Sequence, residues 1–177
     1  MAKKVISIGL SESDINRAIK EIEQYKKDFQ KKVDVFRKKV ADKIAKVSQA
    51  KFNSSGVDDL LRGGTRQAEV SVSVSDSGNI TLVIANGEDV AWVEFGAGVY
   101  HNGSAGSSPN PYGKELGITI GSYGDGHGKQ EVWGFYETPG DPTTLQLTHG
   151  TEATMPMYNA VQSIIPQIIS IAREVFG

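Results

Sequence analysis

Residues 14–51 read DINRAIKEIEQYKKDFQKKVDVFRKKVADKIAKVSQAK, and no other part of the chain constrains the fold as strongly. The stretch contains neither glycine nor proline, and its apolar residues recur at steps of three and four with one step of seven. This period is typical of a narrow apolar stripe along a helix. Ser11 or Ser13 can supply the N-cap, so we expect one long helix over 11–51. The stripe consists of Ile15, Ile19, Ile22, Phe29, Val33, Phe36, Val40, Ile44 and Val47.

The length of this helix predicts that part of it lies outside the domain. A helix of 38 residues spans about 57 Å at about 1.5 Å per residue. A compact domain of 177 residues is only about 40 Å across. We expect the overhanging part to bury its stripe against a neighbouring subunit. The alternative is a helix that breaks near Gln30 and folds onto its own sheet.

Charge is distributed unevenly along the chain. Residues 17–51 hold 12 Lys or Arg and 5 Asp or Glu, a net charge of +7, whereas the remainder holds 7 and 16, a net charge of −9. Three interpretations are open. The basic residues can solvate the helix, they can contact DNA phosphates, or the helix of one copy can lie along the acidic body of the next. We favour the third, because the helix lacks the interleaved exposed aromatic residues that would favour DNA contact.

Beyond the long helix, a turn-rich connector over 53–64 contains Leu60 and Leu61, which predict a single helical turn. Apolar residues then alternate with polar ones, which predicts strands of an antiparallel meander. The strands of the meander cover 68–74, 80–85 and 90–95. A fourth sheet strand is predicted over 131–137, a brief one at 116–120, and a short first strand over 4–8, before the long helix.

A long loop over 96–130 holds ten of the twenty glycines. The last element is a helix over 154–176 with Thr154 as N-cap, and Pro166 should kink it or split it after Ile165. The fold class is therefore α+β, in one domain over 1–177. We expect an antiparallel sheet of about four to five strands packed with a long N-terminal helix and a C-terminal helix.

Patterns for catalysis or cofactor binding are incomplete. The glycine-rich residues 121–130 place Tyr123 and Gln130 where a Walker loop needs Gly and Ser or Thr. The three histidines lack metal-ligand spacing, no G-x-S-x-G motif occurs, and without cysteine there are no disulfides or thiolate sites. Glu94 beside Trp92 is a candidate general base if buried, although a surface or interface carboxylate is the favoured interpretation. We expect a non-enzymatic protein without cofactor or metal.

Two segments carry a resemblance to a known family. Residues 91–98, AWVEFGAG, resemble the "v-E-f-G-t-g" signature of the tail-completion, or neck, family of long-tailed bacteriophages, which includes proteins similar to minor tail protein Z of lambda-like phages. Residues 148–160, THGTEATMPMYNA, resemble its second signature, a small-residue turn followed by proline, an apolar residue and the final helix. Both terminal helices match the family's layout, so the resemblance covers nearly the whole chain.

The resemblance implies a structural role in late assembly, at the head–tail junction. The expected state is a ring of identical subunits, six-fold to match a tail, in contact with tail terminator, tail tube and head-closure or connector proteins. The protein would be made in the host cytoplasm and end in the virion neck, close to DNA and away from membranes. A non-specific DNA-binding accessory protein that uses the basic helix is the alternative. The candidate interface residues are Lys31, Lys32, Lys38, Lys39, Trp92, Glu94 and Phe95.

Overall fold

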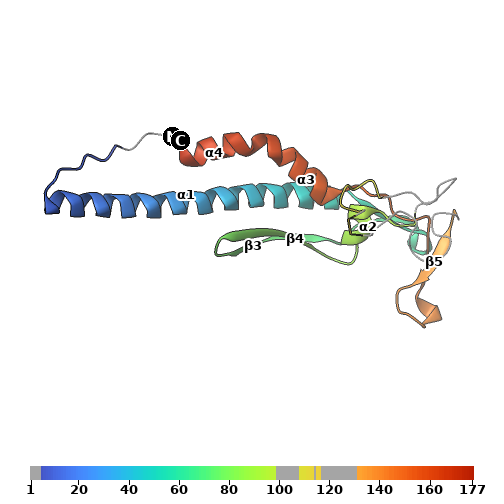
Figure 1. Ribbon diagram of the computed structural model, residues 1–177. Coiled ribbons are helices and arrows are strands. Elements are labelled where there is room, and N and C mark those ends of the chain that lie inside the picture. Colours follow the sequence, from blue (N-terminus) through green and yellow to red (C-terminus); the bar gives the residue numbers. More distant parts are fainter. Residues whose placement is uncertain (1–4, 99–107, 114, 117–130) are drawn as a thin grey trace.

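The computed structural model describes residues 5–98, 108–113, 115–116 and 131–177, and these form an elongated α+β structure (Figure 1). Its longest element is helix α1 (Glu12–Asn53), which has 42 residues and spans about 63 Å. The predicted long helix is confirmed, and it does not break near Gln30. The Ser11 Oγ accepts a hydrogen bond from the Asp14 amide at 3.2 Å, so Ser11 is the N-cap.

Two structural layers cover the C-terminal part of α1 on opposite sides (Figure 1). One is the antiparallel hairpin of β3 (Ser71–Ser77) and β4 (Ile80–Asn86), which was predicted. The other is the pair of helices α3 (Pro156–Ile164) and α4 (Ile168–Phe176). A 3₁₀ turn over Ile165–Gln167 separates them, so Pro166 splits the C-terminal helix as expected.

The predicted single sheet is wrong, because the strands form three separate two-stranded antiparallel pairs. Besides β3–β4, strand β1 (Gly56–Asp59) pairs with β2 (Gly64–Gln67), and β5 (Trp133–Tyr136) pairs with β6 (Leu145–Thr148). The strand predicted over 131–137 therefore exists, but its partner is β6. Residues 5–8 form no strand, whereas the predicted turn at Leu60 and Leu61 is a 3₁₀ turn over Leu60–Arg62.

The predicted third strand over 90–95 is also wrong. This segment is a short helix, α2 (Val90–Phe95), in which the Val93 amide donates to the Asp89 carbonyl at 3.0 Å and the Gly96 amide to the Trp92 carbonyl at 2.8 Å. The β-branched and aromatic composition suggested a strand. Val93 and Glu94 are adjacent in sequence and both buried. A helix can bury two adjacent residues on one side, whereas a strand would place them on opposite faces. The meander consequently ends after two strands.

The core lies at the end of the molecule where α1 terminates. Phe52 of α1 and Val93 of α2 are fully buried and pack with Val57 and Ala68. Farther along α1, the helices α3 and α4 bury their inner residues, among them Ile164 and Ile171. The rest of α1 takes little part in this core, which leaves its first half outside the packed body.

Much of the predicted glycine-rich loop 96–130 lies outside the described residues. The same is true of the Walker-like segment 121–130, of most of the brief strand at 116–120, and of His101 and His127.

Candidate functional site

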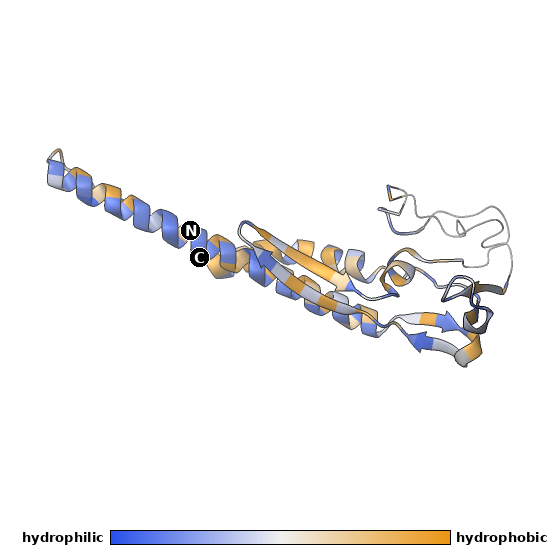
Figure 2. Ribbon diagram, turned by 90° about the horizontal axis from the view of Figure 1, so that it is seen from below, coloured by the Kyte–Doolittle hydropathy of each residue, from blue (hydrophilic) through white to orange (hydrophobic). Residues whose placement is uncertain are grey.

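The first candidate surface is the N-terminal part of α1, residues 12–32, which we call the α1 overhang. It extends beyond the hairpin and beyond α4, and apolar residues recur along it (Figures 1 and 2). All residues from 22 to 32 are exposed. The apolar stripe continues into this region about half exposed, since Ile15, Ile19, Ile22 and Phe29 are 42–51% exposed. Within the described part of the chain, cover is limited to the buried Ala18 and to the Phe29 ring, whose centroid lies 5.7 Å from that of Phe176 of α4. Single exposed apolar residues are ordinary, but a continuous row of them indicates an interaction surface.

Three of the four candidate lysines are free to meet a partner. Lys31, Lys32 and Lys38 are exposed on α1. Lys39 is different, because its Nζ lies 2.5 Å from the Glu174 Oε1 of α4. This ion pair lowers the pKa of Glu174, mainly through the hydrogen bond from Lys39. Lys39 therefore ties α4 to α1 within the chain.

The outer face of the β3–β4 hairpin is a second exposed apolar surface. Ile80, Leu82 and Ile84 of β4 are 42–61% exposed, and in the strand register each faces a serine of β3. The inner face packs on α1 with the alternate residues, such as Val72 and Ala85. A two-stranded hairpin with one open face has little stability of its own, so this face also suits a partner.

Glu94 has a structural role that the sequence did not indicate. It is 6% exposed, and its carboxylate accepts hydrogen bonds from the Met157 and Tyr158 amides at 2.8 and 3.0 Å. The Asn110 side-chain amide donates to the same group at 2.9 Å. Glu94 thus caps the N-terminus of α3, where unpaired N–H groups and the helix dipole favour a negative charge. Both carboxylate oxygens are engaged, which argues against a general base.

The two segments that carry the family resemblance pack against each other. The Val93 carbonyl accepts from the Thr154 and Met155 amides at 2.9 and 3.2 Å, and Ala97 and Thr151 exchange two backbone hydrogen bonds of 2.8 Å. Met155 precedes α3 with a φ of 53° and replaces the predicted Thr154 as N-cap. The segments thus form one junction through which α2 positions α3.

Trp92 and Phe95 do not point to opposite faces, as a strand would require. They are three residues apart on α2 and therefore lie on neighbouring positions of one helical side. Both are partly buried, and the Phe95 carbonyl accepts a hydrogen bond from Ser108. Gly98, with a φ of 57°, allows the Trp133 ring to approach closely, since a Cβ there would lie 2.2 Å from the ring.

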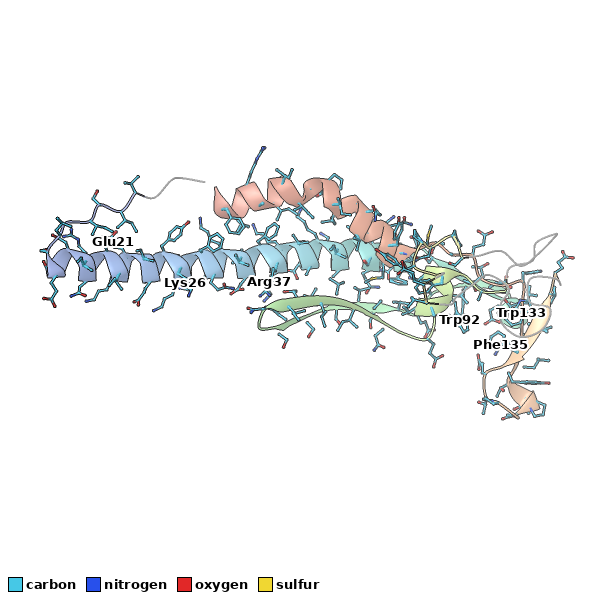
Figure 3. All side chains as sticks on the ribbon, in the orientation of Figure 1. Glu21, Lys26, Arg37, Trp92, Trp133 and Phe135 are labelled. Atoms are coloured by element: carbon cyan, nitrogen blue, oxygen red, sulfur yellow. The ribbon has the colours of Figure 1, made fainter. Side chains whose placement is uncertain are left out.

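Trp92 also lines a pocket of about 270 Å³ between α2 and the β5–β6 hairpin. Its walls include the aromatic rings of Trp92, Trp133 and Phe135, and the centroids of the last two lie 5.7 Å apart. Figure 3 shows these three side chains gathered at the end of the molecule opposite the α1 overhang. The lining holds four carboxylates against one guanidinium, namely Asp58, Glu88, Asp89, Glu137 and Arg66.

The single guanidinium in this pocket is already neutralised. The Arg66 Nη1 and Nη2 donate to the Asp89 carboxylate at 2.7 and 2.8 Å, a bidentate pair whose acid is nearly fully buried. The hydrogen bond with Asp89 raises the pKa of Arg66 further above its ordinary value, although burial of the guanidinium acts in the opposite direction. The charges of Asp89, Glu69 and Asp59 also raise it. The pocket is therefore acidic overall.

The described residues contain no cluster of three His, Asp or Glu that could hold a metal ion. His149 pairs with Asp58, whose Oδ2 accepts from the His149 amide at 2.6 Å. This contact joins the end of β6 to β1. Among the helices that the structure describes, none is both long and apolar enough to cross a membrane.

Comparison of the chain with known protein families, with curated proteins and with solved structures finds no match.

Proposed function

We propose that the chain is a structural assembly protein of the head–tail junction of a long-tailed bacteriophage, acting in a ring of identical subunits. The observation that carries the proposal is the α1 overhang, on which Ile15, Ile19 and Ile22 are 46–51% exposed, while only Phe29 of this row is in ring contact with α4. An apolar helix face is stable in water only when something buries it. A second copy, or a tail or connector protein, would supply that cover.

Exposed apolar side chains outside the overhang also support an assembling subunit. On the outer face of the β3–β4 hairpin, Ile80, Leu82 and Ile84 are 42–61% exposed. The hairpin face and the overhang thus offer two separate apolar surfaces to neighbouring proteins.

The charges of the two ends of the molecule favour head-to-tail contact between copies. The overhang presents exposed lysines, and the opposite end carries the acidic pocket. A contact between two different surfaces repeats from one subunit to the next, and it closes into a ring when the rotation permits. The backbone hydrogen bonds between residues 91–98 and 148–160 hold α2 and α3 together in the part of the molecule on which such a contact would form.

The test is a charge reversal at the exposed candidate lysines of α1, of which Lys31 and Lys32 lie on the overhang. We expect Lys31→Glu, Lys32→Glu and Lys38→Glu together to weaken self-association about tenfold or more, measured by light scattering during gel filtration. Lys46→Glu is a control for reversal at a single position away from the overhang, because Lys46 is also exposed on α1 but lies within the body. Unchanged association of the triple variant would refute the contact between helix and body.

The expectation that the basic helix lacks exposed aromatic residues is wrong, because Tyr25 and Phe29 are 48% and 42% exposed among its lysines. The rival function, non-specific DNA binding through the same lysines, therefore needs a test of its own. It requires retention on duplex DNA with an affinity that falls steeply as salt increases. Under the assembly proposal, the wild-type protein shows no such retention at physiological salt.

A further inference from the structure

We propose that the pocket between α2 and the β5–β6 hairpin binds a lysine side chain from the α1 overhang of a second copy. This inference rests on the proposed function, because it names the contact that joins neighbouring subunits. The pocket would act as the acceptor, and a lysine from the neighbour as the inserted group.

The size of the pocket limits what can enter it. Its volume of about 270 Å³ lies at the lower limit of the roughly 300 to 1,000 Å³ of pockets that hold cofactors or drug-sized ligands. A single extended side chain is therefore the better match. A lysine has a flexible apolar stem that can lie along the rings while its ammonium group reaches the carboxylates.

The chemistry of the walls selects a cation. Trp92, Trp133 and Phe135 offer aromatic faces, against which an ammonium ion is attracted by the ring quadrupole. Glu88 is exposed at the same pocket and adds negative charge. The attraction does not depend on Arg66, since that guanidinium is held by Asp89.

The source of the cation follows from the distribution of charge. Residues 17–51 hold 12 of the 19 basic residues of the chain. On the overhang, Arg17 pairs with Asp14 at 2.9 Å, whereas Lys26, Lys27, Lys31 and Lys32 are exposed. These lysines lie at the other end of the molecule from the pocket, as the labels of Lys26 and Trp92 in Figure 3 show. A lysine of the overhang can therefore reach only the pocket of another copy.

The chain provides a specific optical probe for this contact. It contains two tryptophans, and both line the pocket. Intrinsic tryptophan fluorescence therefore reports pocket occupancy, while light scattering reports assembly independently. We expect the emission of the wild-type protein to shift as its concentration is raised through the range in which it associates.

Two variants of the pocket test the contact directly. Glu88→Gln and Phe135→Ala should each weaken association about five- to tenfold and reduce the shift in tryptophan emission. Glu152→Gln is the control, because Glu152 is exposed outside the pocket and its replacement removes the same charge as Glu88→Gln. Normal association of both pocket variants would overturn the inference and leave the proposed function standing. Absence of any association in the wild type would refute the proposed function, and the inference with it.

A cross-link identifies the occupant. Phe135 is replaced by the photoreactive p-benzoylphenylalanine, and isotopically heavy and light copies are mixed before irradiation. Cross-links from position 135 to residues 20–32 that join a heavy to a light copy support the proposal. Cross-links confined to one copy, or directed only to other segments, contradict it. Saturation of the fluorescence change by spermidine in the unassociated protein, without any such cross-link, would instead assign the pocket to small free cations.

Discussion

Replacing Glu94 by alanine removes the acceptor that caps α3 and joins the two resemblance segments. The change leaves the Met157 and Tyr158 amides and the buried Asn110 side-chain amide without the carboxylate that accepts their hydrogen bonds. Loss of a cap costs about 0.5–2 kcal/mol, and an unsatisfied buried donor adds about 1–3 kcal/mol. We therefore expect Glu94→Ala to lower the free energy of unfolding by about 3 kcal/mol.

Thermal unfolding followed by circular dichroism measures this loss. At about 2–4 °C per kcal/mol for a protein of this size, the melting temperature should fall by about 6–12 °C. Glu94→Gln keeps the side-chain volume and one acceptor oxygen, so its loss should be smaller, about 2 kcal/mol. Glu152→Ala, at an exposed position in the neighbouring segment, should change stability by less than about 0.5 kcal/mol. Equal melting of Glu94→Ala and wild type would refute the capping role.

Two further perturbations follow from the contacts around this junction and along α1. Gly98→Ala should lower the free energy of unfolding by about 1–3 kcal/mol in urea titrations, because the residue has a positive φ and its Cβ would meet the Trp133 ring. A free energy of unfolding within about 0.5 kcal/mol of wild type would contradict the described geometry. The Lys39–Glu174 contact contributes stability above pH 4.5, the ordinary pKa of the acid, and loses it as the pH falls through the lowered pKa in the folded state. A carboxyl NMR titration should give a midpoint below 4.5 for Glu174 in wild type and a higher one in Lys39→Met, and equal midpoints would show that the pair does not form.

The sequence predicted α1 and the β3–β4 hairpin because each has a strong local pattern. The absence of glycine and proline, the stripe and the serine N-cap all favour a helix over the same residues. The alternation on both sides of the turn before Ile80 likewise fixes the hairpin and its register. Pro166 predicted the split of the C-terminal helix because proline lacks the backbone N–H that an α-helix needs, which is also a local property.

Short and non-local features could not be predicted in the same way. Six residues such as Val90–Phe95 are too few to separate a helix from a buried strand by periodicity, although Val90, Val93 and Ala97 have helical spacing. The pairing of β5 with β6 and the cap of α3 by Glu94 join residues that the local pattern does not relate. The aromatic pocket was missed for the same reason, since α2 and β5 supply its walls from distant positions.

Electron microscopy with a gold-labelled antibody against the protein, applied to tailed particles from a lysate of cells that make it, tests the proposed function most directly. The proposal predicts label concentrated at the head-proximal end of the tail. Particles with filled heads and complete tails that carry no label at the neck would contradict it.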